Sequence, residues 1–212
     1  MVRIKICGVT TQVDARMVAD LGADFIGLNF YSQSPRHISG AQAANILRAI
    51  PSHVEPVGLF VNEPIANVQR ISRELGIRTV QLHGDHEDVP SIAENVIPAF
   101  GVWDEGSLDA ISDYFERLRS AHSVEPAAIL VDAHVPGLHG GTGRTAPWHL
   151  LAGFDPGVPV ILAGGLTPEN LAEAIRIVRP WGVDVASGVE SAPGRKDPDK
   201  LRRFIDNARA AC

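Results

Sequence analysis

The chain alternates eight times between short apolar runs and amphipathic helical segments, and this alternation limits its possible folds more than any other feature. Apolar runs rich in β-branched residues predict strands at 2–6, 24–30, 55–61, 78–82, 95–100, 127–132, 158–163 and 182–187. Helical periodicity predicts helices at 11–21, 39–50, 64–75, 85–93, 107–122, 147–151, 168–178 and 197–211. A repeated strand-then-helix order is typical of a parallel sheet covered by helices.

Eight strand–helix units in 212 residues leave about 26 residues for each unit, which is near the lower size limit of a (β/α)₈ barrel. A doubly wound open sheet is the alternative, but that fold usually has fewer strands. No linker, charge run or low-complexity segment divides the chain. We therefore predict an α/β protein in which residues 1–212 form a single (β/α)₈ TIM barrel with minimal decoration. The helices at 85–93 and 147–151 have the weakest patterns.

The composition argues against several classes of protein. A net charge of −6 gives no basic surface of the kind that binds nucleic acid. No apolar stretch reaches the roughly 18–20 residues of a membrane span, and the chain begins with a predicted strand rather than a signal segment. Two cysteines do not make the disulfide framework of a small secreted domain. We expect a cytoplasmic protein without a nucleic-acid or membrane partner. Lysine occurs only at positions 5, 196 and 200, which we attribute to coding bias.

The alternation of side chains along barrel strands predicts which residues face the interior. The apolar residues of the first strand belong against the helices, which turns Lys5 and Cys7 inward. The same reasoning turns Asp132 of the sixth strand and Asp184 of the last strand inward. The first and last strands are neighbours in a closed barrel, and an unpaired interior lysine is costly. We therefore predict a structural ion pair between Lys5 and Asp184.

A thiol and a carboxyl group come at the ends of two predicted strands. Cys7 ends the first strand and Asp132 ends the sixth. Barrel enzymes build their active sites at the carboxyl ends of the strands, so the two side chains form a candidate acid–base pair. Each residue also has an ordinary structural explanation: a buried cysteine fills apolar space, and an aspartate caps a helix.

Three glycine clusters predict a phosphate site. Gly140-Gly141-Thr142-Gly143 follows the sixth strand, Gly164-Gly165 the seventh, and Ser187-Gly188 the eighth. Glycine lets the backbone approach a ligand closely, and free amides at helix N-termini attract anions. Phosphate sites after strands seven and eight recur in this fold. We therefore expect a small phosphorylated molecule as the ligand.

Six motifs, in order at barrel spacing, resemble the phosphoribosylanthranilate isomerase family of tryptophan biosynthesis. The motifs are Lys5-Ile6-Cys7-Gly8-Val9-Thr10, Gln81-Leu82-His83-Gly84, Leu130-Val131-Asp132, Gly140-Gly141-Thr142-Gly143, Leu162-Ala163-Gly164-Gly165-Leu166 and Ser187-Gly188-Val189-Glu190. Together with Lys196-Asp197 they cover essentially the whole chain. The resemblance implies a cofactor-free barrel that converts N-(5′-phosphoribosyl)anthranilate into 1-(2-carboxyphenylamino)-1-deoxyribulose 5-phosphate by an Amadori rearrangement.

The resemblance also implies roles for individual residues. Cys7 matches the general base of the family, Asp132 the general acid, and Arg36 the arginine that binds the anthranilate carboxylate. Apart from the resemblance, we interpret His83 as a hydrogen-bonding residue at the mouth of the barrel rather than a catalyst, and it is a candidate substrate-binding residue. The other expected substrate-binding residues lie in the glycine clusters and are Gly141, Gly143, Gly164, Gly165, Ser187 and Gly188.

Two departures from the family pattern concern the phosphate end of the site. Arg144-Thr145-Ala146-Pro147-Trp148 stands where members often carry Phe-Asp-Trp, and Ala186 replaces a common serine. The proposed acid and base are unaffected by either. At reference pKa values of about 3.9 for Asp and 8.5 for Cys, both groups would hold the wrong proton state near neutral pH. Moving the proton from thiol to carboxylate would then cost roughly 6 kcal/mol.

Several alternatives stay open on sequence grounds. Indole-3-glycerol-phosphate synthase would need several inward lysines, and ribulose-phosphate 3-epimerase would need a set of metal ligands at the strand ends. A barrel that only binds a phosphorylated sugar or a protein is the non-enzymatic alternative. The spacing of His134, His139 and His149 fits no compact zinc motif. The sequence allows either a monomer or a homodimer.

Overall fold

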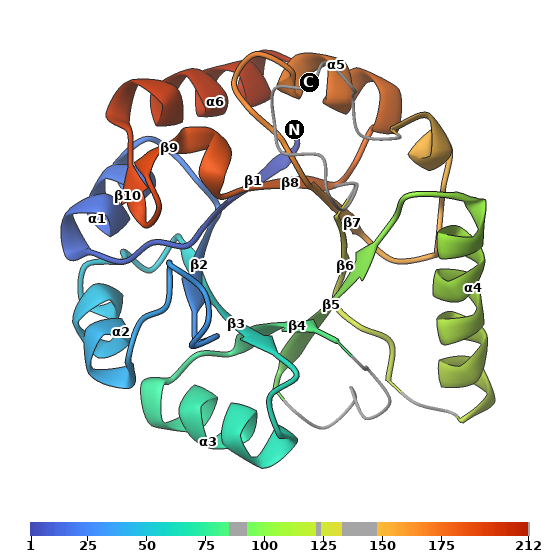
Figure 1. Ribbon diagram of the computed structural model, residues 1–212, viewed down its shortest axis with the longest axis horizontal. Coiled ribbons are helices and arrows are strands. Elements are labelled where there is room, and N and C mark those ends of the chain that lie inside the picture. The colour runs from blue at the N-terminus through green and yellow to red at the C-terminus, as the bar shows by residue number, and fades with distance from the viewer. Residues whose placement is uncertain (85–92, 122–123, 133–147, 212) are drawn as a thin grey trace.

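The computed structural model describes residues 1–84, 93–121, 124–132 and 148–211. Within these ranges eight strands form a closed parallel barrel in the order β1-β2-β3-β4-β5-β6-β7-β8. Figure 1 looks along the barrel and shows the helices arranged around its outside. The predicted (β/α)₈ barrel is therefore confirmed.

The barrel strands agree with the predicted positions to within a few residues. They are β1 (Arg3–Cys7), β2 (Phe25–Asn29), β3 (Glu55–Val61), β4 (Thr79–His83), β5 (Asn95–Gly101), β6 (Ile129–Asp132), β7 (Val160–Ala163) and β8 (Gly182–Val185). The α-helices are α1 (Gln12–Asp20), α2 (Gly40–Leu47), α3 (Ile65–Leu75), α4 (Glu105–Ser120), α5 (Leu171–Val178) and α6 (Pro198–Ala210).

Two layers of apolar side chains hold the barrel together. Residues such as Ile4, Ile6 and Val183 belong to a large cluster between the strands and the helices. A smaller cluster, which includes Leu130 and Ile161, fills the interior. Since neighbouring residues on one strand fall in different clusters, the strands alternate as the sequence predicted.

Side-chain caps fix the start of several helices. Thr11 caps α1 by accepting a hydrogen bond from the Asp14 amide, and Asp197 caps α6 in the same way. Ser39 and Gln42 form a reciprocal capping box at the start of α2. These helices therefore begin within a few residues of their predicted positions.

The connections after β4, β6 and β8 differ in part from the predicted pattern. The predicted helix at 147–151 is a short 3₁₀-helix, η2 (Trp148–Leu151). The predicted helix at 85–93 lies almost wholly outside the described residues. The prediction missed a second 3₁₀-helix, η3 (Ser187–Val189), and a two-stranded hairpin of β9 (Glu190–Ala192) and β10 (Arg195–Lys196), all of which follow β8.

No helix in the described ranges is both long enough and apolar enough to cross a membrane.

Candidate active site

The predicted acid and base lie at the same end of the barrel. Cys7 is the last residue of β1 and Asp132 the last residue of β6, and the strands are all parallel. The carboxyl ends of β1 and β6 therefore lie at the same mouth of the barrel. Going round the barrel from β6 to β1, β7 and β8 lie between them. His83 ends β4 at the same mouth. The closed barrel thus gathers three residues that lie far apart in the sequence.

The Cys7 thiol is almost inaccessible, with 6% of the residue exposed. Burial raises the pKa of this thiol above its ordinary value, because a buried thiolate loses its hydration. The charges of Lys5 and Lys196 act in the opposite direction, whereas the charge of Asp184 adds to the rise. The resting protein therefore favours the thiol over the thiolate near neutral pH.

Arg36 lies directly over the Cys7-Gly8 turn. The loop that carries it is tied to the end of β2, because the Arg36 amide and the Asn29 side chain both donate hydrogen bonds of 3.1 Å to Ser34 Oγ. Gly8 has a φ of 71°, and a β-carbon there would overlap Cδ of Arg36. Glycine at position 8 therefore allows both the turn and the approach of the arginine.

Glu190 holds one edge of the Arg36 guanidinium. Arg36 Nε donates to Glu190 Oε1 at 2.9 Å, and Nη2 donates to Oε2 at 2.6 Å. This hydrogen bonding, together with the charge of the carboxylate, raises the pKa of Arg36. Since a guanidinium is planar and has five N–H donors, the Nη1 hydrogens and the second Nη2 hydrogen point away from Glu190. That edge is suited to a second carboxylate.

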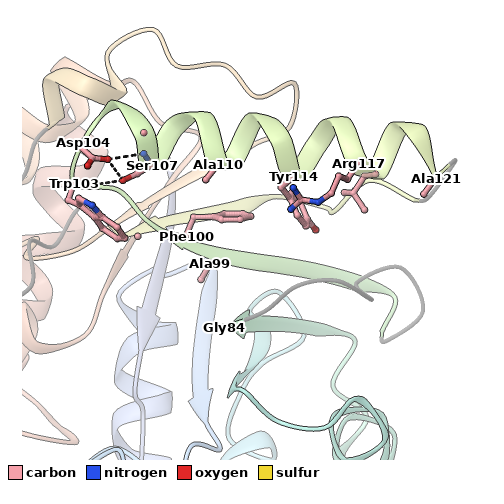
Figure 2. A pocket seen from close by; sticks show the side chains of 13 residues that line it. Gly84, Ala99, Phe100, Trp103, Asp104, Ser107, Ala110, Tyr114, Arg117 and Ala121 are labelled. Carbon is pink, nitrogen blue, oxygen red and sulfur yellow. Dashed lines mark hydrogen bonds between the residues drawn. The ribbon is translucent and has the colours of Figure 1, made fainter.

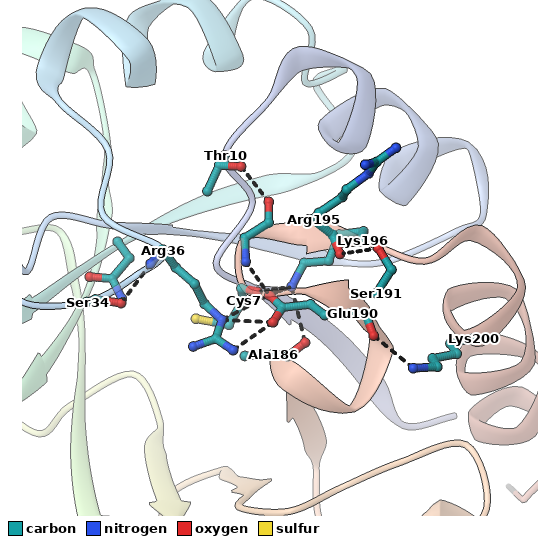
Figure 3. A network of polar contacts seen from close by, with 12 residues as sticks. Cys7, Thr10, Ser34, Arg36, Ala186, Glu190, Ser191, Arg195, Lys196 and Lys200 are labelled. Carbon is teal, nitrogen blue, oxygen red and sulfur yellow. Dashed lines mark hydrogen bonds and ion pairs between the residues drawn. The ribbon is translucent and has the colours of Figure 1, made fainter.

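A fully buried lysine completes this network, which Figure 3 shows beside Cys7. Lys196 Nζ donates to the Cys7 carbonyl oxygen at 2.6 Å, to the Ala186 carbonyl oxygen at 3.2 Å and to Glu190 Oε1 at 3.0 Å. Burial lowers the pKa of Lys196, and Glu190 opposes that shift. For Glu190, burial acts to raise the pKa, but the bonds from Arg36 and the charge of Lys196 outweigh it and lower the pKa.

The role of Lys196 was missed at the sequence level, although a signal was present. All three lysines of the chain make specific contacts: Lys5 with Asp184, Lys196 as above, and Lys200 with the Glu190 carbonyl oxygen at 2.8 Å. The scarcity of lysine therefore marks positions where an ammonium group is used, and coding bias alone does not explain them.

Asp132 is half-buried, and its register places it between Gly101 of β5 and Ala163 of β7. Its carbonyl oxygen accepts a hydrogen bond of 2.9 Å from the Val102 amide. These backbone contacts hold the residue at the rim of the barrel, with its side chain on the inward-facing side of β6.

His83 is bonded to a polar residue of the same strand. His83 Nε2 lies 2.7 Å from Nε2 of Gln81, a residue that is only 1% exposed. Gln81 is therefore part of the interior below the mouth. The Gln81 amide nitrogen is a donor, so Nε2 of the neutral imidazole accepts this hydrogen bond and Nδ1 carries the proton.

The described glycine-cluster residues lie beside one another above β7 and β8. Gly164 and Gly165 directly follow β7 with φ values of 91° and 64°, while Ser187 and Gly188 form part of η3 after β8. Gly165 and Ser187 are exposed at this rim. Gly141 and Gly143 lie outside the described residues, as does most of the Arg144–Trp148 segment.

No group of three or more potential metal ligands occurs among the residues that the structure describes. His149 lies in η2, whereas His134 and His139 fall in the undescribed stretch 133–147.

A separate cavity lies between β5 and α4, and it reaches the mouth of the barrel at Gly84 and Gly101. It has a volume of about 1050 Å³, and Figure 2 shows Phe100 and Tyr114 in its wall. Their rings pack edge to face at 5.2 Å between centroids.

A closed (β/α)₈ barrel with titratable side chains and glycine-rich loops at the carboxyl ends of its strands defines a TIM-barrel enzyme. Comparison with known proteins identifies the family. The family model for N-(5′-phosphoribosyl)anthranilate (PRA) isomerase matches residues 4–207. The N-(5′-phosphoribosyl)anthranilate isomerase of Geobacter metallireducens is 48% identical, with 99% of this chain and 100% of the relative covered. That of Trichlorobacter lovleyi is 46% identical, with both chains fully covered.

Solved structures agree with this comparison. Phosphoribosyl anthranilate isomerase from Thermotoga maritima superposes with a TM-score of 0.89 at 40% identity, covering 99% of this chain and 100% of that one. A phosphoribosyl anthranilate isomerase in complex with reduced 1-(o-carboxyphenylamino)-1-deoxyribulose 5-phosphate gives 0.85 at 38% identity and the same coverage. The chain belongs to the N-(5′-phosphoribosyl)anthranilate isomerase family and is an isomerase of tryptophan biosynthesis. The synthase, epimerase and non-enzymatic alternatives are thereby set aside.

Proposed function

We propose that this isomerase converts N-(5′-phosphoribosyl)anthranilate into 1-(2-carboxyphenylamino)-1-deoxyribulose 5-phosphate, with Asp132 as general acid and Cys7 as general base. The observation that carries the proposal is the meeting of these two strand ends at one mouth, with Arg36 lying over the Cys7-Gly8 turn. In this proposal residues 1–212 act as one catalytic domain without a cofactor, and the chain works as a monomer or a homodimer.

The reaction starts from the state in which the proton of the Cys7 thiol has moved to the Asp132 carboxylate. Asp132 gives its proton to the ring oxygen of the furanose as the bond from C1′ to that oxygen breaks, which opens the ring to a protonated Schiff base. The Cys7 thiolate then takes the proton from C2′. The electrons of that C–H bond form the C1′–C2′ double bond and neutralise the nitrogen, which gives an enolamine that tautomerises to the ketone.

Arg36 supports the anthranilate end of the substrate in this proposal. Glu190 already occupies the Nε–Nη2 edge, at 2.9 and 2.6 Å, so the substrate carboxylate would take the Nη1 side. Two hydrogen bonds from a fixed guanidinium orient a carboxylate, because the donors and acceptors lie in one plane. His83, which ends β4, would contact the substrate from the same rim, two strands further round the barrel from β2.

The phosphate would bind above β7 and β8, at Gly164, Gly165, Ser187 and Gly188, together with Gly141 and Gly143. The exposed positions of Gly165 and Ser187 support this placement. The Ala186 departure removes a hydroxyl, but the backbone at this position still has a structural function, since its carbonyl oxygen accepts a hydrogen bond from Lys196 at 3.2 Å.

The proposal is tested with freshly generated phosphoribosylanthranilate, whose loss is followed by fluorescence. Cys7→Ala and Asp132→Asn should each lower kcat by about 10²-fold or more, because a positioned acid or base typically contributes about 10²–10⁴-fold. Asp113→Asn is the matched control, since Asp113 lies on the exposed side of α4, and it should retain full turnover. Circular dichroism establishes that each variant is folded. Wild-type turnover in both site variants would disprove the assigned roles.

A further inference from the structure

The interior below Cys7 contains a buried ammonium group. Lys5 is two residues before Cys7 on β1, faces the same side of the strand and is only 1% exposed. Its Nζ donates a hydrogen bond of 2.8 Å to Oδ1 of Asp184, which is its register partner on β8. The predicted ion pair is therefore confirmed. Neither member of this pair has a role in the mechanism proposed so far.

Gly27 brings the ammonium group and the thiol into the same small space. This glycine pairs with Cys7 across β1 and β2. A β-carbon at position 27 would lie 2.9 Å from Cys7 Sγ and 3.2 Å from Lys5 Nζ. Both atoms therefore border the volume that the missing side chain leaves open. Any larger residue at this position would separate the sulfur from the cation or displace one of them.

Four charged groups surround the Cys7 thiol, and they belong to different parts of the fold: Lys5 on β1, Asp184 on β8, Lys196 on β10 and Arg36 in the loop after β2. Lys196 donates hydrogen bonds to two carbonyl oxygens and to Glu190, and one edge of the Arg36 guanidinium donates to Glu190. Lys5 is the cation that lies inside the barrel beside the sulfur.

The direction of each electrostatic effect agrees with this geometry. Burial raises the pKa of Cys7, and the Lys5 ammonium is the strongest influence that lowers it, whereas Asp184 raises it. For Lys5, burial acts to lower the pKa, but the charges of Asp184 and then Cys7 outweigh burial and raise it. Lys5 is therefore protonated beside the Cys7 thiolate near neutral pH.

We propose that Lys5, held in place by Asp184, is a positioning residue that stabilises the thiolate of Cys7 for proton abstraction. This inference rests on the proposed role of Cys7 as the base. Lys5 does not transfer a proton in the reaction. It supplies a fixed positive charge that favours the thiolate before C2′ is deprotonated. The opposite charge of Asp184 offsets the desolvation penalty of burying the ammonium group.

Opposite effects of the two partners on the thiol make the proposal testable. In a Cys212→Ser background, we would titrate Cys7 by the ultraviolet absorbance of the thiolate, with the corresponding Cys7→Ser chain as blank. Lys5→Met should raise the thiol pKa by about one pH unit, a tenfold loss of thiolate at a given pH. Asp184→Asn should lower it by a similar amount, because the remaining ammonium loses its other counter-charge.

The double variant Lys5→Met/Asp184→Asn keeps the test valid if Lys5→Met alone fails to fold, because it leaves no unpaired buried charge. The double variant differs from the Asp184→Asn variant only by lacking the ammonium group. The pKa of Cys7 should therefore be higher in the double variant than in Asp184→Asn. At pH values below that pKa, the kcat of the double variant should be about tenfold lower than that of Asp184→Asn. Equal thiol pKa values in these two chains, or single variants that shift in the same direction, would overturn the proposal. A shifted thiol pKa with unchanged kcat would refute its part in catalysis.

The two proposals fail in distinguishable ways. If Cys7→Ala retained full turnover, the role of Cys7 as base would be wrong, yet the titration would still measure whether Lys5 stabilises the thiolate. If Cys7→Ala were inactive and the titration showed no effect of Lys5, only the present inference would be wrong.

Discussion

Lys196→Met is the most informative test of the network that supports the site. The change removes the ammonium but keeps an unbranched side chain of similar length, so packing losses are small. The wild-type ammonium is wholly buried and donates to Glu190 and to the carbonyl oxygens of Cys7 and Ala186. All three acceptors would lose a charged donor.

The magnitude follows from these contacts. Removing one member of a buried ion pair usually costs about 3–5 kcal/mol, because the other charge is left without compensation. Here Arg36 still pairs with Glu190 at 2.6 Å, so the carboxylate keeps one counter-charge. We therefore expect a loss near the lower limit, about 3 kcal/mol in the free energy of unfolding. For a chain of this size that loss lowers Tm by about 6–12 °C.

Lys200→Met is a matched control for this measurement. It is the same chemical change four positions away, and Lys200 Nζ also contacts Glu190, at the backbone carbonyl oxygen. Lys200 is exposed, however, so its loss should cost at most about 1 kcal/mol. Urea unfolding followed by circular dichroism gives both values. Equal effects of the two substitutions, or a Lys196→Met chain within about 1 kcal/mol of wild type, would refute the reasoning.

Two further predictions concern the same region. Gly27→Ala should destabilise the protein by about 1–3 kcal/mol, because its methyl group would lie 2.9 Å from Cys7 Sγ. In contrast, Gly40→Ala in α2, where nothing lies within 4 Å, should be neutral or stabilising in the same thermal unfolding assay. The lowered pKa of Glu190 contributes stability that is present above its ordinary value near 4.5 and is lost as pH falls through the lowered value. The difference in unfolding free energy between wild type and Glu190→Gln should therefore shrink from pH 6 to pH 3, and a constant difference would contradict the linkage.

The sequence was most informative where a local pattern repeats. The period-two alternation of the strands placed Lys5 and Asp184 inside the barrel, and closure between the first and last strands made them partners; the structure has them 2.8 Å apart. The 3₁₀-helix and hairpin after β8 were missed because short irregular elements have no periodic pattern. Arg36 was expected to face a substrate carboxylate, but its pairing with Glu190 was not anticipated.

The sequence by itself determined the barrel, the inward direction of Cys7 and Asp132, and the end of the barrel where they lie. These features follow from the spacing of apolar residues, which repeats every two residues in strands and about every 3.6 residues in helices and can be read directly from the sequence. Tertiary structure alone decided how Glu190 joins Arg36, 154 positions away, and how Lys196 reaches the carbonyl oxygen of Cys7, 189 positions away. Such contacts depend on loop conformations and on closure of the barrel, so no local pattern specifies them.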